Sequence, residues 1–64
     1  MNQKATAYRQ AKGRAFAILR LLKRWNRRRW PGADVRAAVA LHMARRHRLT
    51  TTQTTKLLRS MHLD

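Results

Sequence analysis

The sequence predicts an all-α protein in which a long N-terminal amphipathic helix is followed by a short two-helix hairpin. Apolar residues recur at steps of three and four along most of the chain, which is the spacing of an amphipathic helix. Only two glycines and one proline interrupt the 64 residues, of which 44% are hydrophobic. A chain of this length supports one small domain, so residues 1–64 are expected to form a single unit.

The first predicted helix covers about residues 3–29. Its apolar stripe consists of Tyr8, Ala11, Ala15, Ile18, Leu19, Leu22 and Trp25. Gly13 costs about 1 kcal/mol relative to alanine at such a position. Beside Ala11 and Ala15 it is expected to permit close approach of another helix, and a break near Gly13 remains the alternative. Pro31-Gly32 ends the helix, because the residue before a proline is driven out of the α conformation.

The second predicted helix covers about residues 34–48. Asp34 is expected to cap its start, where a carboxylate accepts hydrogen bonds from unpaired backbone N–H groups. The predicted apolar stripe consists of Val35, Ala38, Val39, His42 and Met43, with Leu41 and Ala44 beside it. Cations fill the last turn, where they complement the helix dipole.

The third predicted helix covers about residues 51–62. Thr50 and Gln53 have the spacing of a capping box, in which each side chain accepts a hydrogen bond from the other residue's backbone N–H. The apolar stripe behind this start consists of Thr54, Leu57, Leu58 and Met61. A strand is the alternative for the threonine-rich segment 50–55, but the segment lacks alternating apolar residues.

The charge of the chain predicts a polyanionic partner. Sixteen Lys and Arg residues face two acids, which gives a formal net charge of +14. Most of these cations are arginine, whose planar guanidinium pairs with phosphate and guanine edges and stacks on rings. We therefore expect nucleic acid, with DNA favoured over RNA. The residues expected to contact phosphate are Arg20, Arg24, Arg27, Arg28, Arg29, Arg45, Arg46 and Arg48.

The short connection between the second and third helices is typical of a helix-turn-helix, in which the second helix presents its first turns to the major groove. Arg48 stands where a glycine often opens such a turn. The residues expected to reach base edges are Thr51, Thr52, Thr55, Lys56 and Arg59. This interpretation predicts a transcriptional regulator or an accessory DNA-binding factor.

Two alternatives use the same cations differently. In the first, the arginine-rich helix enters an RNA stem-loop and Trp25 or Trp30 stacks on an unpaired base, although a core position is favoured for Trp25 at the edge of the apolar stripe. In the second, the chain is a small basic adaptor or inhibitor that docks on an acidic protein surface. Disruption of a membrane is disfavoured, because a lytic peptide has no need of the second and third helices.

A homodimer is expected, because the first helix is longer than the two short helices facing it. A second copy would cover the remaining apolar length. The residues assigned to the core or to this dimer contact are Tyr8, Ala11, Ala15, Ile18 and Leu22.

The composition offers little for catalysis or cofactor binding. Asp34 and Asp64 are far apart in the sequence, cysteine is absent, and no glycine-rich phosphate loop occurs. The three histidines lack carboxylate or thiolate neighbours at ligand spacing, so neither a metal nor another cofactor is expected. The N-terminal residues lack the apolar core of a signal peptide and no segment resembles a membrane span. We therefore expect a cytoplasmic protein that is not an enzyme.

Overall fold

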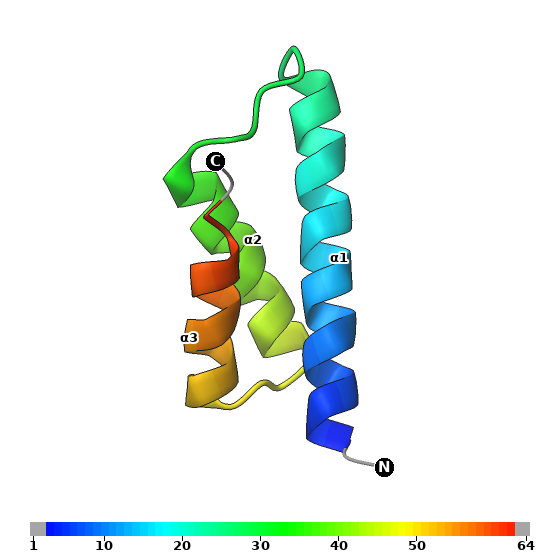
Figure 1. The fold of residues 1–64 in the computed structure, drawn as a ribbon, viewed down its shortest axis with the longest axis vertical. Helices are drawn as coiled ribbons and strands as arrows, with labels where there is room; N and C mark the ends of the chain where they lie inside the picture. The colour runs from blue at the N-terminus through cyan, green and yellow to red at the C-terminus, as the bar shows by residue number, and fades with distance from the viewer. Residues whose placement is uncertain (1–2, 63–64) are drawn as a thin grey trace.

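The computed structural model describes residues 3–62, which form three helices. They are α1 (Gln3–Trp25), α2 (Ala33–Arg46) and α3 (Thr51–Ser60), and Figure 1 shows α1 running the length of the molecule beside the other two. The molecule measures 39 × 18 × 17 Å along its principal axes. The predicted all-α architecture with a long first helix is confirmed, and α1 continues without a break through Gly13.

The end of α1 differs from the prediction, because the helix stops at Trp25 and not near residue 29. Arg27 and Arg28 have φ angles of 55° and 65°, in the left-handed region. The backbone N–H of Arg28 donates to the carbonyl of Lys23 at 2.9 Å. This six-residue closure usually carries glycine at the left-handed position. Arginine stands there instead, so the stop carries no local sequence signal.

The start of α2 corrects the expected role of Asp34. The N-cap is Gly32, in extended backbone, and no side chain caps the helix. Asp34 lies within the first turn, where its charge still complements the helix dipole.

The end of α2 closes through a complete Schellman motif. The N–H of Leu49 donates to the carbonyl of Ala44 at 2.9 Å, and the N–H of Arg48 donates to that of Arg45 at 3.2 Å. Arg48 has a φ of 52°, so arginine again occupies the place that glycine favours. The helix therefore ends at Arg46, two residues before the predicted boundary.

The capping box of α3 is confirmed. The backbone N–H of Gln53 donates to Thr50 Oγ1, and the backbone N–H of Thr50 donates to Gln53 Oε1, both at 3.1 Å. The helix ends at Ser60 and not near residue 62.

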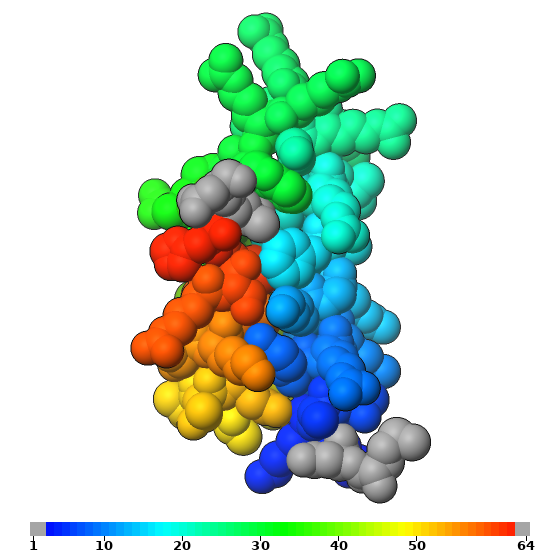
Figure 2. Space-filling model, viewed as in Figure 1, coloured from blue at the N-terminus to red at the C-terminus, as the bar shows by residue number. Residues whose placement is uncertain are grey.

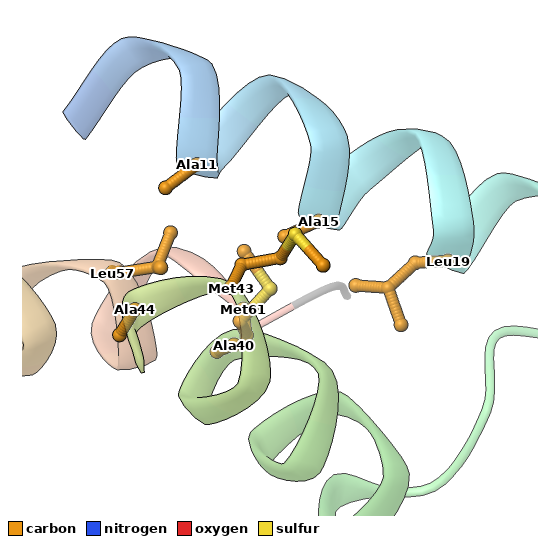
Figure 3. Packing of buried hydrophobic residues seen from close by; sticks show 8 residues of the cluster. All are labelled: Ala11, Ala15, Leu19, Ala40, Met43, Ala44, Leu57 and Met61. Atoms are coloured by element: carbon orange, nitrogen blue, oxygen red, sulfur yellow. The ribbon is translucent and has the colours of Figure 1, made fainter. Parts of the chain in front are cut away.

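The buried core is small and rich in alanine. It consists of Ala11, Ala15, Leu19, Ala40, Met43, Ala44, Leu57 and Met61, and Figure 3 shows these side chains pointing toward one another from all three helices. Alanines on facing helices let their backbones approach closely, while the flexible methionines fill the irregular space that remains. Such a core buries little apolar area for a chain of this length.

The predicted inner face of α2 was wrong in part. Val35, Ala38 and His42 are exposed, whereas Ala40 joins Met43 and Ala44 in the core. Helical spacing alone does not distinguish the two sides of α2, because apolar residues occur on both of them.

Gly13 does not serve close helix packing, contrary to the expectation. A Cβ added at this exposed position would meet no atom within 4 Å.

None of the helices within residues 3–62 has a segment that is both long and apolar enough to cross a lipid bilayer.

Candidate nucleic-acid interface

The outer surface of α3 gathers the side chains that the sequence assigned to base contacts. All five are exposed, and they line one shallow depression: Thr51, Thr52, Thr55, Lys56 and Arg59. Their arrangement follows from helical spacing, because the opposite side of α3 buries Leu57 and leaves Thr54 and Leu58 half-buried. This outer surface is called the α3 face below.

Not all hydroxyls of the α3 face are equally available. Thr55 Oγ1 donates to the carbonyl of Thr51 at 3.0 Å, so its proton is already used within the helix. Thr51 and Thr52 make no side-chain hydrogen bond to the described residues. Their hydroxyls can therefore both donate to and accept from a ligand.

The turn before the α3 face is held by hydrogen bonds at both of its ends. The Schellman motif closes α2, the capping box opens α3, and Leu49 between them packs against the core. Arg48 projects from this turn as an exposed side chain. The first turn of α3 therefore has a fixed position relative to the rest of the fold, which a base-reading helix needs.

A basic groove lies between α1 and the start of α3, with a volume of about 630 Å³. Its residues come from both helices: Lys4, Ala5, Tyr8, Arg9, Lys12, Thr50, Thr52, Gln53 and Lys56. Figure 2 shows the two helices side by side on this face of the molecule. Lys56 Nζ lies 5.1 Å from the centroid of the Tyr8 ring, within cation–π range. We call this feature the α1–α3 groove.

Sequence reasoning missed the groove. Lys4, Arg9 and Lys12 were not predicted to belong to the interface. Their position beside α3 follows from the parallel arrangement of α1 and α3, which the sequence alone does not show. The helical period does place Lys4, Tyr8 and Lys12 on one side of α1, and that spacing was the available signal.

The eight arginines predicted to contact phosphate are all exposed, but the fold does not bring them together. Arg45, Arg46 and Arg48 lie where α2 meets α3, so they share the end of the molecule that holds the α3 face. We call it the α3 end. Arg24, Arg27, Arg28 and Arg29 lie at the opposite end, where Figure 2 shows side chains projecting away from the body. This second region, residues 24–32, is called the Trp25 end. Arg20 lies on α1 between them.

The two tryptophans have different surroundings. Trp25 is 75% exposed, so the expectation that placed it in the core is wrong. Trp30 is half-buried against the core, and Lys23 Nζ covers its ring at 4.3 Å from the centroid. Trp25 alone therefore offers an accessible ring face.

The residues assigned to the core or a dimer contact lie in or beside the core of a single chain. Ala11 and Ala15 are fully buried, and Tyr8, Ile18 and Leu22 are half-buried against them. The Tyr8 hydroxyl is buried without a hydrogen-bond partner. These side chains hold α1 against the other two helices.

The electrostatic environment is strongly one-sided. All sixteen Lys and Arg residues lie within residues 3–62, where Asp34 is the sole acid. The pKa of His47 is lowered from its usual value. The first cause is burial of the imidazole, and the second is the positive charge of the nearby Arg14 and Arg46. Its Nε2 atom is buried without a hydrogen-bond partner. Within the same residues no group of three or more potential metal ligands occurs.

Comparisons with protein-family models, curated proteins and solved structures give no match for this chain. The functional argument therefore depends on the geometry and charge described above.

Proposed function

We propose that the protein binds duplex DNA through the α3 face, as a transcriptional regulator or an accessory DNA-binding factor. The observation that carries this proposal is the convergence of Thr51, Thr52, Thr55, Lys56 and Arg59 on one exposed surface at the start of a firmly capped helix. Hydroxyl, ammonium and guanidinium groups are the side-chain types that read base edges in the major groove.

The cations around the α3 face supply the backbone contacts that such docking needs. Phosphate contacts set the orientation of a protein on the duplex, while base contacts supply specificity. The α1–α3 groove contributes Lys4, Arg9 and Lys12 on one side of the α3 face. Arg45 and Arg48 lie near the turn before it. Contacts to the DNA backbone on each side of the α3 face would hold the start of α3 in the major groove.

Duplex DNA is favoured over structured RNA for this surface, because the major groove of B-DNA admits a helix whereas that of A-form RNA is too narrow. The test is fluorescence anisotropy with a random-sequence DNA duplex and a structured RNA, each across a series of salt concentrations. Each neutralised phosphate of B-DNA steepens the dependence of log K on log salt by about 0.9. We expect a slope of several units and tighter binding to the duplex.

Two arginine variants separate the α3 face from general charge. Arg59→Ala removes a cation from the α3 face, and Arg29→Ala removes one from the Trp25 end; both positions are exposed. Arg59→Ala should weaken duplex binding more than Arg29→Ala. Equal effects would contradict the proposed surface, and weak binding to both nucleic acids would redirect the search to an acidic protein partner.

The expected homodimer has its own test, which is sedimentation with and without duplex. A monomer under both conditions would contradict the homodimer.

A further inference from the structure

We propose that the Trp25 end is a second nucleic-acid site, which takes an unpaired base on the Trp25 ring and the neighbouring phosphates on Arg27 and Arg28. The inference rests on the proposed function only because both sites would bind nucleic acid. It uses a different surface and a different form of the ligand, so the two can fail separately.

The ring of Trp25 forms part of an apolar hollow. Leu22, Pro31 and Val35 line this hollow with Trp25, and Val35 is itself 43% exposed. A nucleobase has flat faces of comparable size to an indole, and stacking on such a ring tolerates any base. Trp30 cannot serve in the same way, since Lys23 already covers its ring.

The arginines beside Trp25 adopt a backbone conformation that disfavours them. Left-handed φ angles are unfavourable for a residue with a side chain, and two occur in succession at Arg27 and Arg28. Glycine would remove this strain and would close the turn equally well. Strained positions that persist on an exposed surface point to a use for the side chain. Here the two side chains add positive charge two and three residues along the chain from the exposed Trp25 ring.

The charges favour a nucleotide over a second copy of the chain in this hollow. A second copy would bring Arg24, Arg27 and Arg28 against the same cations, and Asp34 is the sole acid within residues 3–62 to offset them. A single-stranded nucleic acid supplies a base for the ring and a phosphate on each side of it. A lipid surface needs a continuous apolar face, whereas Arg24 and Asn26 flank Trp25 here.

The test is quenching of Trp25 fluorescence by a short oligothymidylate. Trp30→Phe leaves Trp25 as the single tryptophan and keeps an aromatic ring beneath Lys23. Oligothymidylate should quench the Trp25 fluorescence of this variant. Trp25→Ala should lose about tenfold in affinity for oligothymidylate, the effect of one stacked base. The affinity of Trp25→Ala for duplex should stay unchanged. If Trp30→Phe fails to fold, the difference between the native protein and Trp25→Phe gives the same signal.

Arg27→Gly and Arg28→Gly test the phosphate contacts while preserving the turn. Each should reduce the salt slope for oligothymidylate by about 0.7, the value for one phosphate of a single strand. Trp25→Ala should weaken binding without changing that slope. Circular dichroism checks that the helices remain.

Three results would overturn the inference: unquenched Trp25 in a protein that still binds duplex, unchanged oligothymidylate affinity in Trp25→Ala, or quenching by phosphatidylserine vesicles without quenching by oligothymidylate. Failure of the proposed function has another signature. In that case Arg59→Ala leaves duplex binding intact, while Trp25→Ala still weakens binding of the single strand.

Discussion

The side-chain amide of Gln53 donates a 2.9 Å hydrogen bond to the backbone carbonyl of Lys4, which joins the first turn of α3 to the first turn of α1. The oxygen of the same amide accepts from the N–H of Thr50 in the capping box. One side chain therefore caps α3 and docks it on α1. This double contact fixes the width of the α1–α3 groove and the position of the α3 face.

Replacing Gln53 should weaken the fold through both contacts. We expect Gln53→Ala to lower the free energy of unfolding by about 1–2 kcal/mol, the combined effect of a lost cap and a lost hydrogen bond. Urea unfolding followed by circular dichroism measures this. Thr52→Ala is the control, since Thr52 is exposed in the same turn without a side-chain bond to the described residues. A similar loss in both variants would contradict the assigned role.

Arg48 is expected to favour binding at the expense of stability. Arg48→Gly relieves the left-handed strain, whereas Arg48→Ala removes the charge and keeps the strain. The glycine variant should be more stable than the alanine variant by about 1 kcal/mol. Both should bind duplex equally, and more weakly than the native protein. Native-like binding in either variant would show that Arg48 makes no phosphate contact.

Gly13→Ala should stabilise α1. The site is exposed, lies within a continuous helix and has room for a Cβ, so the helix propensity of alanine should raise the free energy of unfolding by about 1 kcal/mol. Ala17→Gly, at another exposed position of α1, should lower it by a similar amount. Thermal and urea unfolding of both variants check the symmetry. A destabilised Gly13→Ala would mean that Gly13 makes a contact outside the single chain.

The lowered pKa of His47 gives the stability a pH dependence of defined sign. The unfolded chain takes up a proton near pH 6.5, whereas the folded chain resists it because of burial and the charges of Arg14 and Arg46. The folded state therefore binds fewer protons in this interval, and its stability should fall as the pH drops below about 6.5. Below the folded pKa the contribution is constant.

His47→Gln should flatten this dependence, as measured by urea unfolding between neutral and mildly acidic pH. His42→Gln, at an exposed position of α2, is the control and should retain the slope. An unchanged slope in His47→Gln would assign the pH response to another group.

The sequence predicted the elements of the fold well and their contacts less well. Apolar spacing located three helices, and the Thr50–Gln53 pair located the start of α3. The predicted ends of α1 and α2 are too late, because the left-handed positions that follow these helices, Arg27, Arg28 and Arg48, carry arginine and not glycine. The inner side of α2 was predicted wrongly in part, since apolar residues occur on both sides of this helix and only the packing against α1 and α3 shows that Ala40 is buried and Val35 exposed.

In the candidate interface, too, features within one helix could be predicted from the sequence, whereas features that depend on contacts between helices could not. The shared exposure of the five side chains of the α3 face follows from helical period, because all of them belong to one element. The α1–α3 groove depends on a tertiary contact between Lys4 and Gln53 that no local pattern reports. The separation of the arginines into two ends likewise depends on the direction of α1 relative to α2.

The alanine-rich core has a consequence for the ionic conditions under which the chain folds. Four of its eight members, Ala11, Ala15, Ala40 and Ala44, contribute one methyl group each to the attraction that opposes the repulsion of sixteen cations. Counterions reduce that repulsion over about 10 Å at 0.1 M salt. The surrounding anions are therefore a part of what keeps the three helices together, and a nucleic acid would supply them at high local concentration. Dilution into water of very low ionic strength should loosen the fold before any denaturant is added.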